Sequence, residues 1–181
     1  MFPMSMEDGE IAWFSPDPRA IVPLESFRVP HGLRRTLKKR RFEVRVNTAF
    51  DIVIRRCADR PETWINEEII ASYINLHHLG HAHSVEAWCN GRLGGGLYGV
   101  ALGGAFFGES MFHEVSDASK VALHALVDRL IQRGFVLLDT QWTTPHLLTF
   151  GAIEVPRTLY RQLLEKALLM KTRFLDEGSS R

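Results

Sequence analysis

The sequence predicts an α/β (α+β) protein with a central mixed, mostly antiparallel sheet flanked by helices. From residue 47 onward, the hydrophobic pattern runs helix, helix, three strands, helix, strand and a final helix. A helix that follows a hairpin and leads back to a buried strand makes the sheet mixed. The 181 residues fit one domain, and contents of 45% hydrophobic and 24% charged residues are ordinary for a globular protein.

The N-terminal part combines turn signals with a basic segment. Its first 30 residues are rich in Pro, Asp and Ser, which predicts loops and a short strand. Residues 31–41 have the composition of a short basic helix, and residues 42–46 alternate as a strand does. The next helix is indicated by the spacing of four apolar residues: Phe50, Val53, Ile54 and Cys57.

The middle of the chain predicts a helix and a three-stranded meander. The helix spans residues 66–79, with Asn66 as its N-cap and Gly80 at its end. Residues 83–88 and 92–112 are rich in strand-forming residues and contain glycine-rich connections, so we expect three antiparallel strands there.

The C-terminal part alternates between helix and strand. Ser116 or Asp117 caps a helix that Gly134 ends. Residues 135–141, FVLLDTQ, begin with four apolar residues and predict a buried strand. Pro156 then opens a last helix.

This order of elements is that of the GNAT acyltransferase fold. We therefore expect a GNAT-like catalytic domain over residues 31–175. Residues 1–30 form a separate N-terminal segment in this scheme, and residues 176–181, DEGSSR, form a frayed tail. A fold alone does not identify a function, which has to come from particular residues.

The charge is distributed unevenly along the chain. Residues 28–60 carry eleven Lys and Arg against three Asp and Glu, although the net charge of the whole sequence is only +1. A solvated helix face is the alternative for such a run, but acidic partners at helical spacing are mostly missing. The cluster favours a polyanionic partner, and nucleic acid is the first candidate.

Several classes of protein are disfavoured by the composition. No apolar run approaches 18 residues, so we expect no membrane span, and the first ten residues lack the features of a signal peptide. Two cysteines cannot form a disulfide framework, which indicates a reduced, cytoplasmic protein. The glycine-rich run at 91–96 lacks the Lys-Ser/Thr of a phosphate-binding loop.

A run of histidines is the weakest candidate for a functional motif. It comprises four residues: His77, His78, His81 and His83. Gly80 interrupts the helix that would align them, and no carboxylate completes a ligand set, so we expect no metal.

Three polar residues occur where apolar neighbours predict burial. Glu109 lies within FFGESMF, and Asp139 and Gln141 end the strand FVLLDTQ. Residues two apart on a strand share a face, so we expect Asp139 and Gln141 to point the same way. A buried carboxylate is costly unless it is paired, and this cost suggests either a structural partner or a functional site.

Seven blocks of sequence carry a resemblance to a known family. They are WFSPDPRA (13–20), CADRPETWI (57–65), LHHLGHAHSVEAW (76–88), LGGGLYGVALGGAFFGESMF (93–112), SDASKVAL (116–123), LLDTQ (137–141) and FGAIEVPR (150–157). In these blocks the sequence resembles the bacterial leucyl/phenylalanyl-tRNA–protein transferases, collinearly from about residue 2 to residue 160. The family's catalytic domain is GNAT-like, in agreement with the element order.

The resemblance implies an activity and partners. The family moves Leu or Phe, with Met as a further candidate, from aminoacyl-tRNA to proteins with N-terminal Arg or Lys, and so marks them for N-end-rule degradation. We expect a monomer without cofactors. Relatives carry a small N-terminal domain, so residues 1–30 correspond to a remnant of it.

The family motifs also imply site residues. The catalytic candidates are Asp139, Gln141 and Glu109, and the aminoacyl pocket corresponds to Trp64, Leu97, Phe106 and Met111. The expected tRNA-binding residues come from the basic cluster at 28–60, and they are Arg34, Arg35, Lys38, Lys39, Arg40, Arg41, Arg45, Arg55 and Arg56.

For the chemistry, we expect Asp139 to hold the side-chain NH₂ of Gln141, so that the Gln141 oxygen orients the attacking amine. Glu109 would then pair with the cationic end of the acceptor.

Two other functions remain as alternatives. A GNAT enzyme could transfer an acyl group from acyl-CoA, although no glycine turn precedes the helix near residue 120. A relative could also bind tRNA without catalysis.

Overall fold

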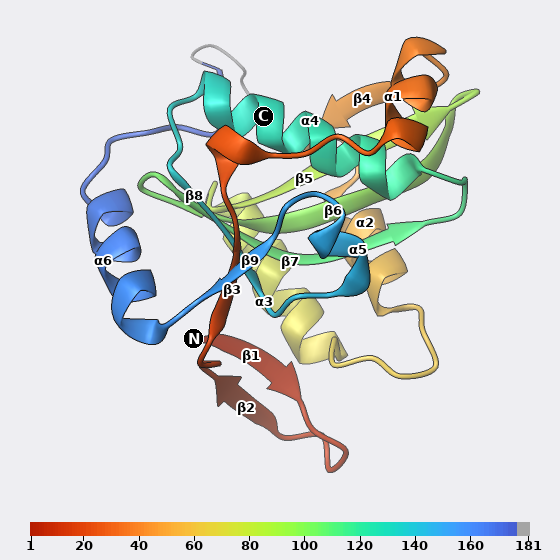
Figure 1. Ribbon diagram of the computed structural model, residues 1–181. Coiled ribbons are helices and arrows are strands. Elements are labelled where there is room, and N and C mark those ends of the chain that lie inside the picture. Colours follow the sequence, from red (N-terminus) through yellow and green to blue (C-terminus); the bar gives the residue numbers. More distant parts are fainter. Residues whose placement is uncertain (177–181) are drawn as a thin grey trace.

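The computed structural model describes residues 1–176 and builds a seven-stranded sheet in the order β4-β5-β6-β7-β8-β3-β9 (Figure 1). The strands are β3 (Arg19–Val22), β4 (Glu43–Val46), β5 (Ala82–Cys89), β6 (Arg92–Leu102), β7 (Ala105–His113), β8 (Leu137–Gln141) and β9 (Ile153–Val155). Neighbouring strands are antiparallel except for the parallel pair β7–β8. The predicted mixed, mostly antiparallel sheet is therefore confirmed.

Helices cover both faces of the sheet (Figure 1). They are α1 (His31–Lys38), α2 (Phe50–Ala58), α3 (Glu67–His78), α4 (Ala118–Gln132), α5 (Pro145–Leu148) and α6 (Arg157–Leu168), with a short 3₁₀ turn at Leu24–Ser26. The order α2, α3, β5, β6, β7, α4, β8 is the one that suggested a GNAT-like fold. Two elements, α5 and β9, were not predicted from the sequence, and together they span only seven residues.

Strand alternation divides the core into two layers. Leu97 on β6 packs with α4 on one face, whereas its neighbour Tyr98 packs with α2 and α3 on the other. A smaller cluster joins α6 to β3, β8 and β9. Each face of the sheet is therefore sealed by a different set of helices.

The helix ends agree with the sequence signals, with one exception. Asn66 accepts a hydrogen bond from the backbone N–H of Ile69, as an N-cap should. Asp117 stands at the N-cap position of α4, but its side chain does not cap the helix. Its carboxylate binds the Thr36 hydroxyl and Lys120 instead, because α1 lies within reach of this corner.

The N-terminal segment contributes to the main sheet. A separate hairpin of β1 (Phe2–Ser5) and β2 (Ile11–Phe14) is followed by β3, which lies between β8 and β9. The domain limits at residues 30 and 175 stay predictions. The predicted tail lies outside the described residues except for Asp176, whose carboxylate pairs with Arg129 and Arg133 of α4.

The parallel pair β7–β8 separates early, which creates room between two strands. Its register runs only from Ala105 opposite Leu137 to Phe107 opposite Asp139. Strand β7 continues to His113 without this partner. The candidate site lies in this gap.

Candidate functional site

A first cavity of about 350 Å³ lies where β7 and β8 diverge. Its walls are mostly apolar and come from β6, β7, β8, α4 and α5; they include Leu97, Met111, Leu126, Leu138 and Leu147. An apolar cavity of this size suits one hydrophobic side chain.

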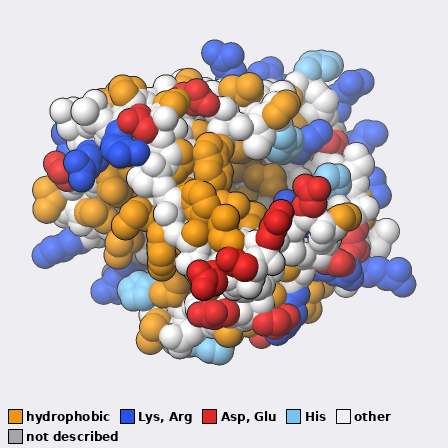
Figure 2. Space-filling view, turned by 90° about the horizontal axis from the view of Figure 1, so that it is seen from below, with side chains coloured by type: hydrophobic (Ala, Val, Ile, Leu, Met, Phe, Trp, Pro, Cys, Tyr) orange, Lys and Arg blue, Asp and Glu red, His pale blue; other side chains and the backbone are white. Residues whose placement is uncertain are grey.

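A second cavity of about 570 Å³ lies between the β1–β2 hairpin, α3 and α6. Trp13, which is 65% exposed, lines it together with Glu68 and Leu168. Seen from the side of the hairpin, the surface is hollowed between hydrophobic side chains, acidic side chains gather beside the hollow, and basic ones lie mostly toward the edges (Figure 2).

Three residues line both cavities: Phe2, Glu109 and Gln141. Two of them are polar, and both were singled out in the sequence. Glu109 and Gln141 are therefore the polar residues that the two cavities share.

Asp139 is completely buried and fully supplied with partners. Arg19 donates from Nε to Oδ1 at 2.9 Å and from Nη2 to Oδ2 at 2.8 Å, which is a bidentate ion pair. The Tyr160 hydroxyl donates to Oδ2 at 2.5 Å, and the backbone N–H of Gln141 donates to Oδ1 at 2.9 Å. The cost of burying this carboxylate is thus offset by partners on two strands, β3 and β8, and on helix α6.

Gln141 adopts a backbone conformation that is unusual for a residue with a side chain. Its φ is +61°, in the left-handed region. The bond from its own N–H to Asp139 holds this conformation at the end of β8. The strain is stored where the chain leaves the sheet, and the side chain is presented to both cavities.

The expected link between Asp139 and the Gln141 side chain is wrong. Asp139 binds the Gln141 backbone, and the carboxamide Nε2 of Gln141 lies 3.4 Å from Glu109 Oε2. The left-handed turn at Gln141 breaks the simple alternation that places residues two apart on one face. Asp139 therefore contacts Gln141 through the backbone N–H and not through the carboxamide.

Glu109 is the less satisfied carboxylate. It lies on β7 against the apolar wall, and this burial raises its pKa to about 8. A hydrogen bond from Tyr73 of α3 opposes the rise, Asp139 adds to it, and Arg19 reduces it. The second side chain beside it is the distant carboxamide of Gln141. Near neutral pH this acid is poised between its protonated and ionised forms.

Within residues 1–176, three buried side-chain polar atoms lack a hydrogen-bond partner in the protein: Tyr98 Oη, Thr140 Oγ1 and His146 Nε2. All three residues line the first cavity. Buried polar atoms are normally satisfied, so this concentration marks the cavity as a place where a bound group supplies partners.

The four residues expected in an aminoacyl pocket divide three to one. Trp64, Leu97 and Met111 line the first cavity. Phe106 does not: it is fully buried in the core, and its ring stacks on Phe174 at a centroid distance of 5.3 Å. The structure thus places Phe106 behind the cavity wall, because residue 106 on β7 points toward α4 within the closed part of the sheet.

The residues expected to form a basic surface fall into two groups, those without an ion-pair partner and those paired with acids. Arg35, Lys38, Lys39 and Arg40 are exposed on α1 and the turn after it, and in the part of the chain that the structure describes they have no ion-pair partner. Arg34 and Arg41 are exposed too but donate to Val29 O and Cys89 Sγ.

The remaining members are already paired with acids. Arg45 pairs with Glu43, Arg55 with Glu67, and Arg56 with Glu114 and Asp59. The available positive charge is therefore concentrated on α1 and the following turn.

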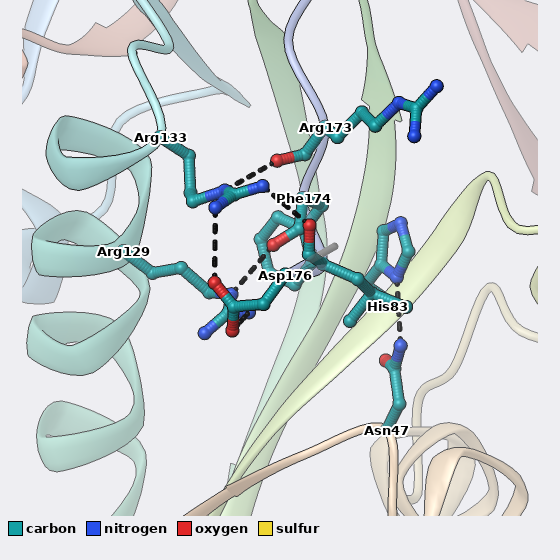
Figure 3. A network of polar contacts seen from close by, with 8 residues as sticks. Asn47, His83, Arg129, Arg133, Arg173, Phe174 and Asp176 are labelled. Carbon is teal, nitrogen blue, oxygen red and sulfur yellow. Dashed lines mark hydrogen bonds and ion pairs between the residues drawn. The ribbon is translucent and has the colours of Figure 1, made fainter. Parts of the chain in front are cut away.

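The histidine run does not form one cluster: His83 is buried, whereas His78 and His81 are exposed. His83 Nδ1 lies 3.0 Å from the side-chain nitrogen of Asn47, and its ring stacks on Phe174 (Figure 3). Arg129 donates to the carbonyl oxygen of Phe174, and Arg133 donates to the carbonyl oxygens of the residues on either side of it. Burial lowers the pKa of His83 to about 4. Among the described residues, no group of three or more His, Cys, Asp or Glu could hold a metal ion.

Sequence reasoning missed the residues that complete the site, above all Arg19, Tyr73 and Tyr160. The buried Asp139 signals that a cation must accompany it, but nothing local indicates which of the 22 basic residues does so. Arg19 lies 120 residues away and meets Asp139 only because β3 pairs with β8.

No described helix is long and apolar enough to cross a membrane.

Comparison with known proteins shows which family the sequence matches. The family model for leucyl/phenylalanyl-tRNA protein transferase matches residues 21–165. Proteins with this name are 55% identical in Gloeobacter violaceus, over 96% of this chain and 90% of that protein, and 58% identical in Akkermansia muciniphila, over 92% and 89%.

Two solved structures are also similar. AAC(6')-Iy in complex with a bisubstrate analogue is 14% identical with a TM-score of 0.41, over 77% of this chain and 98% of that one. The L-PGS structure from Bacillus licheniformis is 13% identical with a TM-score of 0.47, over 91% and 52%.

Proposed function

The chain belongs to the leucyl/phenylalanyl-tRNA protein transferase family, and from this premise we propose how its two cavities carry out aminoacyl transfer. The protein is an aminoacyltransferase. Its proposed donor is tRNA charged with Leu or Phe, and its proposed acceptor is a protein with N-terminal Arg or Lys. Transfer would mark that protein for N-end-rule degradation.

The first cavity is the proposed site for the side chain of the transferred amino acid. Its walls of Leu97, Met111 and Leu138 are apolar, and a volume of about 350 Å³ accommodates Leu or Phe. Selection by such a cavity is moderate, because one methyl group is worth about 1–3 kcal/mol.

The second cavity is the proposed site for the acceptor. Its acidic residues, Glu68 on the rim and Glu109 at the junction, complement a cationic N-terminus. Charge-assisted pairing with Glu109 would favour Arg or Lys over a neutral residue. An acceptor held there presents its α-amine at the junction of the cavities.

The junction supports the proposal most strongly. An amine must lose its proton and approach an ester carbonyl, and Gln141 and Glu109 face both cavities. Gln141 is proposed to orient the amine, while Asp139 and Arg19 fix the Gln141 backbone. Most of the acceleration would come from holding two bound reactants together.

The tRNA is proposed to bind along α1 and the turn after it. Lys38, Lys39 and Arg40 are exposed there, and phosphate contacts of this kind position a nucleic acid without reading its sequence. Leu or Phe transfer therefore depends on the aminoacyl end and not on the sequence of the stem.

Transfer of labelled Leu from charged tRNA to a peptide with N-terminal Arg tests the function. Product is expected with Leu-tRNA and Phe-tRNA, and much less with Ile-tRNA. The same peptide with an acetylated N-terminus is the matched control and should accept nothing. Transfer from acetyl-CoA in place of tRNA would support the alternative of a CoA-dependent enzyme and contradict the proposal.

A further inference from the structure

We propose that Glu109 carries the proton of the transfer reaction: its carboxylate takes a proton from the attacking amine and returns it to the ribose oxygen that leaves. This inference rests on the proposed function, since it assigns a role at the same junction. It gives Glu109 a task beyond pairing with a cationic acceptor.

The position of Glu109 carries the argument. Among the described residues, it is the carboxylate that lines both cavities. Gln141 lies beside it, with Nε2 3.4 Å from Glu109 Oε2, so an amine oriented by Gln141 is within reach of Glu109. Any proton released at the junction meets this carboxylate first.

The other candidates for proton acceptor are weaker. Asp139 is fully buried, and both of its oxygens already accept hydrogen bonds from Arg19, Tyr160 and the Gln141 backbone. The carboxamide of Gln141 is too weak a base to hold a proton. The geometry therefore separates an orienting group, Gln141, from a proton-carrying group, Glu109.

The reaction balances with Glu109 as a shuttle. The neutral amine attacks the ester carbonyl carbon and forms the C–N bond, which leaves a positive charge on nitrogen. That nitrogen loses a proton to the carboxylate of Glu109. The C–O bond to the ribose then breaks, and Glu109 gives its proton to the leaving oxygen. Glu109 ends as it began, and no other reactant is consumed.

The surroundings of Glu109 suit this exchange. Burial raises its pKa to about 8, close to the value of about 7.7–8.0 for an unperturbed α-amine. Four charged or titratable side chains and the amino group of residue 1 act on it: Tyr73 from α3, Tyr98 from β6, Asp139 from β8 and Arg19 from β3. The free amine and Glu109 therefore lose their protons over the same pH range.

The first test is Glu109→Gln, which keeps the shape of the side chain and removes the proton acceptor. Single-turnover transfer to a peptide with N-terminal Arg is measured at saturating donor and acceptor between pH 5.5 and 9. The rate should fall about 10²–10⁴-fold. Below neutral pH, log rate should rise with a slope of about two in the unaltered enzyme, which must deprotonate amine and Glu109, and about one in the variant.

Tyr73→Phe is the second test and keeps the carboxyl in place. The Tyr73 hydrogen bond lowers the pKa of Glu109, so its loss raises that pKa further. The acidic limb of the rate profile should move to higher pH, while the rate at high pH is preserved. A merely structural role for Tyr73 would lower the rate equally at every pH.

The outcomes separate the inference from the proposed function. Transfer by the unaltered protein tests the proposed function alone. The role of Glu109 is tested separately, by comparing the slopes of log rate against pH for the unaltered protein and Glu109→Gln. A Glu109→Gln protein that keeps its saturated rate and its slope, and shows only a higher KM for the peptide, would overturn the shuttle and leave Glu109 as a binding group. If Glu109→Gln does not fold, an unmoved profile in Tyr73→Phe overturns it instead.

Discussion

Asp139 on β8 and Glu109 on β7 are carboxylates on neighbouring strands, yet the protein supplies them with different partners. Asp139 receives a bidentate Arg19, the Tyr160 hydroxyl and a backbone N–H, and none of its surface is exposed. Glu109 has a hydrogen bond from Tyr73 and a distant carboxamide, and it faces two cavities.

The difference shows that two carboxylates predicted from the same family motifs can have different surroundings, one fully paired within the protein and the other only partly paired. A carboxylate with all its partners inside the protein fixes geometry, because moving it costs several bonds at once. A carboxylate whose partners are incomplete can respond to a substrate, because its protonation state is easily changed. We therefore expect Asp139 to fix the geometry of the candidate site and propose Glu109 as the group that takes part in the chemistry.

The largest expected effect comes from changing Asp139, the carboxylate whose partners all lie inside the protein. Asp139→Asn leaves the Arg19 guanidinium buried without its counter-charge, which should cost about 3–5 kcal/mol of unfolding free energy. For a chain of this size the melting temperature should fall by roughly 6–20 °C. Glu109→Gln is the matched change on the open side and should melt at or above the unaltered protein at pH 8. A Tm change within 2 °C for Asp139→Asn would refute the holding role.

A second pair of variants separates core from cavity wall. Phe106→Ala removes a fully buried ring and should destabilise the fold by about 3–5 kcal/mol. Met111→Ala enlarges the first cavity, so it should raise the KM for charged tRNA and relax the choice between Leu and Phe, with a smaller loss of stability. Melting curves and donor kinetics are measured together. A stable Phe106→Ala protein with an altered choice between Leu and Phe would show that Phe106 belongs to the wall of the first cavity.

The basic residues allow the same comparison between open and satisfied groups. Reversal of Lys38, Lys39, Arg40 and Arg41 to Glu should weaken tRNA binding more than tenfold and reduce the salt dependence by about one unit of slope per lost phosphate contact. Arg55→Gln with Arg56→Gln is the control, because both residues already pair with acids. Filter binding at several salt concentrations measures both. Equal losses of tRNA affinity in the two variants would contradict the expectation that only the unpaired basic residues bind tRNA.

A fourth expected effect is a pH dependence of stability. The folded-state pKa of Glu109, about 8, lies above its usual value of 4.5, so the folded protein binds more protons than the unfolded chain between these values. This contribution to stability is complete below pH 4.5 and is lost as pH rises through 8. The Tm of Glu109→Gln should therefore gain on that of the unaltered protein from pH 5 to pH 9. A constant difference would contradict the raised pKa.

Much of the fold could be predicted because its signals are local. The Asn66 cap, the apolar run before Asp139 and the meander over residues 83–112 each depend on neighbours in sequence. β9 was missed because three residues give no period, and the place of β3 in the sheet depends on pairing across more than 100 residues.

The residues of the candidate site were predicted from the sequence, but the contacts between them were not. Glu109, Asp139 and Gln141 were found because polar residues interrupt apolar runs and match family motifs. The role of Asp139 was misjudged because it depends on Arg19, Tyr160 and the left-handed backbone of Gln141, which no local pattern records. Tertiary contacts decided which acid was sealed and which remained open.

The most direct measurement is the titration of the Glu109 carboxyl itself. Carboxyl-¹³C-labelled glutamate is introduced, and NMR spectra are recorded between pH 4 and 9.5, with Glu109→Gln used to assign the resonance. A titration midpoint of about 8 is expected for Glu109, because this partly buried acid lies against an apolar wall without a fixed counter-charge. A midpoint near the ordinary value of 4.5 would show that Glu109 is fully ionised at neutral pH, and it would contradict the division between a sealed and an open carboxylate.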